Sequence, residues 1–289
     1  MSPRNRLFGL VTTSVIGTMA APWALAQGVM TTGSATPTEQ LLTNRFEVDL
    51  AAFVLSSKIN GELRGTIQTQ TGIDFSQNFG ADGDQTRIRA GALWRITPRQ
   101  GLRFSYFDND VTRMRDIPPL TWGDYTFSGQ TAAETKFRIY ELGYEFSFMN
   151  HPAYKVTATA GVHVEDFTIK LSGNATLTNP DGATQTVNGA IQSNSVTAPL
   201  PVLGLRGDWA ATDHVYVDGS LQAFKINYQG INGNWSDLWV GVTWMFNDHF
   251  GIGAAFDRWA VHVDLSKSAF SGRLNLGYQG GLIFLRAGF

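Results

Sequence analysis

Apolar and polar residues alternate along most of the chain after residue 45, and such period-two alternation is the sequence signature of a β-strand. Residues 46–54 read FEVDLAAFV, so Phe46 and Val48 share one face of the predicted strand while Glu47 and Asp49 share the other. Nine further segments alternate in the same way, at about 87–96, 101–109, 138–148, 155–165, 201–209, 214–224, 237–246, 250–259 and 273–289. The pattern therefore predicts an all-β chain of about ten strands.

The connections between these segments alternate between short and long. Short turns are predicted at 97–100, 150–152, 211–213 and 247–249, and longer polar or glycine-rich links at about 58–84, 112–132, 172–193, 228–234 and 266–272. Antiparallel neighbours joined in this way form an up-and-down sheet with tight turns at one edge and loops at the other. Residues 58–84 could supply one more hairpin, so we consider eight to twelve strands compatible with the pattern.

The last predicted strand ends on the C-terminal residue itself, although chain termini are usually polar and frayed. Gly280 and Gly281 are expected to form a bulge that shifts the phase of the alternation. Before the bulge, one face carries Leu274, Leu276 and Tyr278. After it, an apolar face is kept by Ile283, Leu285, Ala287 and Phe289, opposite Leu282, Phe284 and Arg286.

Both a soluble β-sandwich and a transmembrane barrel explain alternation, but three features favour the barrel. The predicted strands span about 10–15 residues, whereas soluble strands usually have five or six and a tilted membrane strand needs about 9–11. Aromatic residues recur near the short turns, as expected at a membrane interface. No stretch after the N-terminus could form a transmembrane helix, and in lipid only helices and closed barrels pair every backbone amide. We therefore predict a transmembrane antiparallel β-barrel over residues 45–289.

The N-terminus predicts export. Arg4 and Arg6 precede an apolar run, and Ala24-Leu25-Ala26 matches a signal-peptidase site, so residues 1–26 are predicted to be a cleavable signal peptide. Residues 27–44 are small and polar without periodicity, which predicts a disordered periplasmic lead-in. The chain has no cysteine, so neither disulfides nor thiolate metal sites are available. Its net charge of −2, without basic runs, gives no indication of nucleic-acid binding.

Five segments, TGIDFSQNFG, RQGLRFSYFDND, YELGYEFSF, APLPVLGLRGDW and YQGGLIFLRAGF, resemble parts of Gram-negative outer-membrane barrel proteins that are loosely OmpA-like or porin-like. The resemblance covers nearly all of the predicted mature chain and implies an outer-membrane location. The terminal Phe289, preceded by alternating apolar residues, resembles the assembly signal of such proteins and implies insertion by their barrel-assembly machinery. The resemblance implies little about function, because unrelated functions share such barrels.

Charged residues occupy the faces that would line the lumen of the barrel. Arginines dominate the second and third predicted strands, which lie between acidic first and fourth strands. These residues form either a network of ion pairs that fills the interior or a narrow charge-lined pore. The predicted lumen residues are Glu47, Asp49, Arg87, Arg89, Arg95, Arg103, Glu141, Glu145, Arg206, Asp208, Asp218, Asp237 and Asp257.

Two histidines are candidates for catalysis at the loop rim. His163 lies near Glu165 and Asp166, and His262 lies two residues before Asp264, so either histidine could act with a carboxylate as a general base. No nucleophile motif accompanies them, and no two histidines on one strand have metal-ligand spacing. We therefore expect neither an enzyme nor a metal or cofactor site, and no catalytic residue is assigned.

The expected role is that of an outer-membrane barrel that is structural in the envelope or passes small solutes or ions. A hydrolase acting on lipid or peptide at the rim, and a recognition protein using the loops at 112–132 and 172–193, are the alternatives. The expected partners are outer-membrane lipid, lipopolysaccharide and the barrel-assembly machinery, and the expected state is a monomer.

Overall fold

The structure of the protein is a computed structural model that describes residues 35–65, 83–122, 125–179, 182–228, 231–267 and 270–289. The predicted signal peptide at 1–26 and the lead-in up to residue 34 lie outside the described residues. So does most of the link at 58–84 in which a further hairpin was considered.

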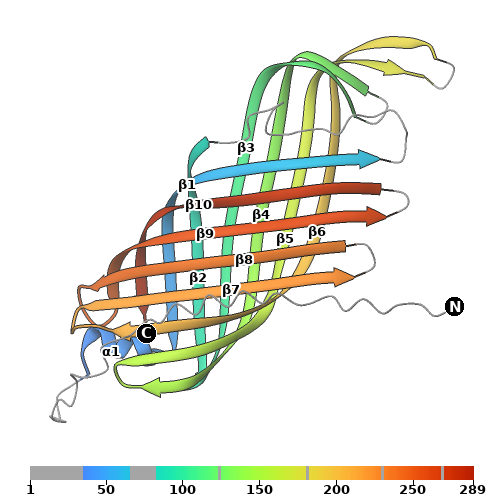
Figure 1. Cartoon of the computed structure of the whole chain (residues 1–289). Helices are drawn as coiled ribbons and strands as arrows, with labels where there is room; N and C mark the ends of the chain where they lie inside the picture. The colour runs from blue at the N-terminus through green and yellow to red at the C-terminus, as the bar shows by residue number, and fades with distance from the viewer. Residues whose placement is uncertain (1–34, 66–82, 123–124, 180–181, 229–230, 268–269) are drawn as a thin grey trace, which may run out of the picture. The chain divides into compact units, whose positions relative to one another are not determined.

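Ten antiparallel strands close into one barrel in which each strand pairs with its neighbours in sequence, and β1 pairs with β10 (Figure 1). This architecture confirms the predicted fold and strand number. The elements are α1 (Pro37–Thr43), β1 (Phe46–Gly65), β2 (Gly83–Thr97), β3 (Gln100–Trp122), β4 (Tyr125–His151), β5 (Tyr154–Thr178), β6 (Thr184–Ala210), β7 (Val215–Tyr228), β8 (Ile231–Met245), β9 (Phe250–Lys267) and β10 (Phe270–Gly288).

An apolar belt surrounds the outside of the barrel next to the short turns. On β1 the outward side chains of Phe46, Val48, Leu50 and Val54 are about half exposed, as are Ile283 and Leu285 on the neighbouring β10. The belt spans the nine residues from Phe46 to Val54 on β1, which matches the length that crosses a bilayer at a tilt. Aromatic residues gather at the short-turn end of the belt: Phe46, Trp94, Phe148, Trp209, Trp244, Phe246, Phe250 and Phe289.

The long links predicted at 112–132 and 172–193 are not loops but paired strands, so that prediction was wrong. β3 and β4 stay paired up to Trp122 and Tyr125, and β5 and β6 up to Thr178 and Thr184. Beyond the belt the outward face of a strand no longer contacts lipid, so the apolar alternation that marks a membrane strand weakens although the backbone ladder continues. Strands β3 to β6 thus form a four-stranded sheet beyond the barrel wall, which we call the extension sheet (Figure 1).

The extension sheet separates from the barrel wall where the β6–β7 ladder ends, at Leu203 and Ala223. Prolines explain this end. The N–H of Ala210 donates to Ala153 on the β5 side, and backbone N–H groups alternate sides along a strand. The odd-numbered Pro199 and Pro201 therefore occupy positions whose N–H would point toward β7, where proline has none to donate.

Strand β10 contains no bulge at Gly280 and Gly281, contrary to the sequence-based prediction. Its pairing with β1 and with β9 runs through both glycines without a shift in register. The inward face consequently keeps one phase along the strand, and it carries Leu276, Tyr278, Leu282, Phe284 and Arg286, all buried. Leu276 and Tyr278 thus face the barrel interior rather than lipid.

Part of the predicted disordered lead-in forms the helix α1. Thr36 caps the helix by accepting a hydrogen bond from the Glu39 N–H, while the Glu39 carboxylate accepts one from the Thr36 N–H. Leu41 and Leu42 are fully buried in a small apolar cluster with Tyr216 and Met245. These contacts hold α1 against the short-turn end of the barrel. No helix in the described ranges is long and apolar enough to cross a membrane.

A glycine on the inward face of β5 provides a test of the close packing of the wall. A Cβ added at Gly161 would meet the backbone carbonyl of Leu142 and lie 2.7 Å from the Gly143 Cα, whereas one added at Gly207 would meet nothing within 4 Å. We expect Gly161→Ala to lower the free energy of unfolding by about 1–3 kcal/mol, and Gly207→Ala to change it by less than about 0.5 kcal/mol. Urea titration monitored by heat-modifiable gel migration would measure both, and equal stabilities would contradict the packing.

Candidate functional site: a charged layer inside the barrel

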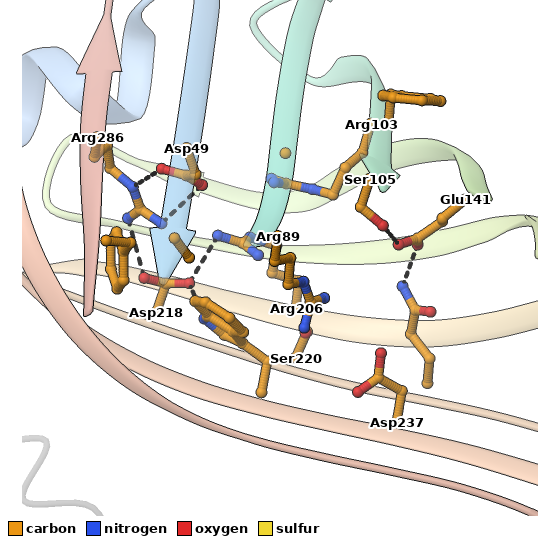
Figure 2. Close-up of a pocket in the computed structure, with 16 residues that line it drawn as sticks. Asp49, Arg89, Arg103, Ser105, Glu141, Arg206, Asp218, Ser220, Asp237 and Arg286 are labelled. Atoms are coloured by element: carbon orange, nitrogen blue, oxygen red, sulfur yellow. Dashed lines mark hydrogen bonds and ion pairs between the residues drawn. The ribbon is translucent and has the colours of Figure 1, made fainter. Parts of the chain in front are cut away.

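Arg286, from β10, points toward Asp49 and Asp218 inside the barrel (Figure 2). Its guanidinium donates from Nε and Nη2 to the two carboxylate oxygens of Asp49, at 2.7 and 3.2 Å, and from Nη1 to Asp218 at 3.0 Å. The side chain is only 1% exposed. Asp49 is the cross-strand partner of Arg286 where β1 closes on β10, so strand closure itself places this pair together.

Asp218 on β7 joins Arg286 to a second arginine. One carboxylate oxygen of Asp218 accepts from Arg286, and the other accepts from Arg206 at 3.0 Å and from the Trp239 indole at 2.7 Å. Arg206 also donates to Asp208 at 2.9 Å. Because each of these charges has a charged partner and several hydrogen bonds, the desolvation cost of burying them is offset.

Three further arginines pair with carboxylates around this centre. Arg95 contacts Glu47 at 3.2 Å, Arg103 contacts Glu145 at 2.5 Å, and Arg89 forms an ion pair with Asp257. Together with the Arg286 and Arg206 groups and with Glu141 and Asp237, these pairs form what we call the charged layer.

The structure places twelve of the thirteen predicted lumen residues in the charged layer, and Arg87 beyond it. Arg87 donates to the side chain of Asn109 at 2.9 Å, nearer the extension sheet. Sequence analysis missed Arg286 and Lys155 as lumen residues. Arg286 could have been found because it lies on the predicted face opposite Ile283 and Leu285, and Lys155 shares the inward phase of Thr157 and Thr159.

An aromatic layer fills the interior between the charged layer and the extension sheet. The ring of Tyr278 lies 5.4 Å from Phe53, 4.8 Å from Phe107 and 5.4 Å from Trp259, measured between ring centroids. Trp259 in turn lies 4.8 Å from Phe137. All five side chains are at most 6% exposed. An apolar interior at this level differs from the polar lumen of an open channel protein.

The two candidate catalytic histidines lie on opposite faces of the barrel wall. His163 points inward and is 2% exposed; its Nε2 lies 3.4 Å from Glu141, and its ring packs edge-on against Trp235. Glu165 is also buried inside, whereas Asp166 faces outward and accepts from Thr197 at 2.5 Å.

His262 points outward. Its ring contacts Asp264 at 3.0 Å and also hydrogen-bonds Asn275 on β10. The two histidines therefore do not share a site. Among the described residues no group of three or more histidine, aspartate or glutamate side chains could hold a metal ion.

Outside the belt, an exposed ion cluster joins β4 to β5. Glu134 contacts Lys136 at 2.8 Å and Lys170 at 3.4 Å. The hydrogen bond from Lys136, helped by Lys170, holds the pKa of Glu134 below its ordinary value.

A closed antiparallel barrel with an apolar outer belt and a charged, buried interior defines the class of outer-membrane β-barrel proteins. No protein-family model and no curated protein matches the chain, whereas solved structures do. The outer membrane protease OmpT from Escherichia coli matches with a TM-score of 0.56 at 12% identity, over 84% of this chain and 96% of that one. The translocator domain of autotransporter NalP from Neisseria meningitidis has a TM-score of 0.45 at 11% identity, over 84% and 88% of the two chains. The likeness to OmpT shows the fold of Gram-negative outer-membrane barrels and nothing of activity.

The central ion pairs predict a large effect of one substitution. We expect Arg286→Ala to lower the free energy of unfolding by about 3–5 kcal/mol, because it leaves Asp49 and Asp218 buried without their shared partner. Arg99→Ala, in an exposed turn, is the matched control and should change it by less than about 0.5 kcal/mol. Urea titration of the refolded variants measures both. Similar values for the two would show that the layer is solvated rather than buried.

The exposed cluster predicts a pKa change. Because the pKa of Glu134 is lowered in the folded protein, the stabilisation from its ion pairs is complete above the unfolded value of about 4.3 and is lost as the pH falls through the folded value. We expect Lys136→Met to raise the pKa of Glu134, measured by NMR titration of its carboxyl carbon. Lys225→Met, also exposed, is the control. An unchanged pKa in Lys136→Met would rule out the contact.

Proposed function

We propose that this chain is an integral outer-membrane barrel with a structural role in the envelope and without a permanently open pore. The observation that carries the proposal is the occupation of the interior at three successive levels. Helix α1 packs against the short-turn end, the charged layer follows, and the aromatic layer separates it from the extension sheet.

The charged layer favours a structural role over conduction. A conducting pore needs sites that bind ions weakly enough to release them, along a path that contains water. Here Arg206 and Arg286 are 7% and 1% exposed, and each is held by two carboxylates at 2.7–3.0 Å. Moving such a side chain aside would leave buried charges unpaired, which is costly.

The belt supports a location in a membrane, because large apolar side chains about half exposed on the barrel's outside are stable only against lipid or a partner. We propose that the predicted signal peptide exports the chain and that its terminal Phe289 takes part in assembly in the outer membrane. Lipid and lipopolysaccharide would then be its immediate partners, and one copy suffices to close the barrel.

We also propose that the protein is not an enzyme. His163 is enclosed by the wall and by Trp235, so a substrate would have to displace packed side chains to reach it. His262 and Asp264 lie on the outward face, with no nucleophile assigned beside them. The protease activity in the name of OmpT belongs to that protein, and fold likeness at 12% identity does not transfer it.

Planar-bilayer recording tests the closed interior. Residues 27–289 are refolded, and heat-modifiable migration on a gel checks that they are folded. We expect this protein to give no stable current steps over a range of salt concentrations. Leu42→Asp, which would displace α1, should stay silent because the charged and aromatic layers remain; Thr43→Asp, exposed on the same helix, is its control. Discrete salt-dependent steps in the wild type would overturn the proposal in favour of a pore. Current steps in Leu42→Asp, but not in the wild type or in Thr43→Asp, would show that α1 closes the lumen and that the charged and aromatic layers do not.

A further inference from the structure

Strand β6 forms one edge of the extension sheet, and among the described residues no strand pairs with it on the side away from β5 (Figure 1). Its pairing with β7 ends at Leu203, whereas its pairing with β5 continues to Thr184. Gly189, with a φ of +69°, lies where the register between β5 and β6 shifts. Between this bulge and Pro199, residues 190–198 therefore form a regular strand with one unpaired side.

The ladder with β5 determines which backbone groups lie on the unpaired side. Its register is unbroken from Ala190 to Trp209, so the alternation of N–H directions that starts from Ala210 holds over this stretch. Odd-numbered residues therefore direct both their N–H and their C=O away from β5. These residues are Ile191, Ser193, Ser195 and Thr197. A row of unpaired backbone groups on an edge strand is a template for another strand.

The opposite edge of the extension sheet, on β3, offers a different surface. Beyond Phe107 it carries two prolines and five charged residues, and Arg87 donates to the Asp110 carbonyl. Charged residues and prolines discourage pairing on an edge, whereas residues 184–202 of β6 contain no charged residue. Pairing of β6 with the β3 edge of a neighbouring copy is therefore disfavoured. The uncharged β6 edge fits a partner edge that is also uncharged.

We propose that the β6 edge pairs antiparallel with the same edge of a second copy of this chain. The register centred on residue 194 places Ile191 of one copy opposite Thr197 of the other, and Ser193 opposite Ser195. Four residues from each copy, each with one N–H and one C=O, then form up to eight hydrogen bonds. No like charges meet in this register, and the two-fold contact is closed because each edge is used once.

The symmetry of this pair determines where the second copy lies. Two antiparallel strands are related by a two-fold axis perpendicular to their sheet. Because β6 continues the barrel wall, this axis lies close to the membrane plane, and the second barrel points the opposite way. The two barrels therefore lie in facing membranes. Residue 194 is nine positions from the exposed Leu203 of the belt, so at about 3.3 Å per residue the two belts are at most about 60 Å apart along the strands.

The contact suits adhesion between many copies rather than a tight dimer. Each main-chain hydrogen bond on an exposed edge adds little net free energy, so one pair of copies is weak. Several pairs between the same two membranes reinforce one another, because the first pair holds the others close together. The contact would join cells or vesicles that carry the same protein. It rests on the proposed membrane location of the belt and not on the closed interior.

Cysteine cross-linking tests the register, because the chain has no cysteine of its own. In the proposed pair residue 194 lies opposite itself with Cα atoms about 4.5 Å apart, which is within the range of a disulfide. We expect residues 27–289 with Asn194→Cys, refolded in detergent and oxidised, to form mainly a linked dimer. Met114→Cys, 69% exposed at the β3 edge, is the matched control and should stay mainly monomeric. Equal amounts of dimer in the two variants would overturn the proposal and leave a segment of another protein as the occupant of the edge.

Vesicle aggregation tests the facing arrangement. The protein is inserted into preformed phosphatidylcholine vesicles, so that the large extension sheet stays outside, and flotation checks the insertion. We expect light scattering to rise as vesicles that carry the protein aggregate. Ser195→Pro removes one edge N–H from each copy and should weaken aggregation about tenfold or more. Ser195→Ala keeps this N–H and should behave as the wild type.

A second substitution at the same position guards against a folding defect. Ser195→Lys keeps the N–H but adds a charge to the edge, so it should also weaken aggregation, and heat-modifiable gel migration checks that each variant is folded. Aggregation that persists in both Ser195→Pro and Ser195→Lys would overturn the edge as the contact. Insertion of the wild type without aggregation would overturn the facing arrangement. Protein that fails to float with the vesicles would overturn the membrane location itself, while cross-linking in detergent still decides the pairing.

Discussion

The structure depends on the closure of the barrel by hydrogen bonds between its first and last strands. Phe46 and Phe289 exchange N–H···O bonds of 2.9 and 2.8 Å, and the ladder between β1 and β10 continues from there to Gly65 and Phe270. In lipid an unpaired amide has no water to bind, so a barrel that failed to close would not be stable in the membrane. This is the physical reason for an apolar strand that extends to the end of the chain.

Closure also creates the interior and its chemistry. Because side chains alternate across a strand, every strand with an apolar outer face sends its other residues into an enclosed space. The charges that enter this space must be neutralised there, and the seam itself supplies the central pair, Asp49 on β1 with Arg286 on β10.

The extension sheet separates from the barrel wall for a reason that lies in the local sequence of β6. The β6–β7 ladder ends below Pro199 and Pro201, and from there β6 stays paired only with β5. The free edge of β6, from Thr184 to Val202, carries Pro199 and Pro201 but no charged residue. The equivalent edge of β3 also has two prolines, and it carries Asp108, Asp110, Arg113, Arg115 and Asp116. Charges and prolines on an edge discourage pairing with other chains, so the two edges differ in how well they are protected.

The sequence by itself determined the class of fold, the ten strands, the four short turns and the side of the wall on which Glu47, Arg206 or Leu285 lies, because these depend on period-two alternation and turn residues. It did not determine how far the strands continue beyond the belt. Alternation of apolar and polar residues weakens there, because an outward face that does not contact lipid need not be apolar. Pairing across the seam decided the phase of Leu276 and Tyr278 on β10, and it decided that Arg286 meets Asp49. Tertiary packing decided that Leu41 and Leu42 are buried, although the capping pair Thr36 and Glu39 was visible as a local signal. Which charges meet, and which oxygens are left without partners, depends on residues far apart in the chain and is decided only when the barrel closes.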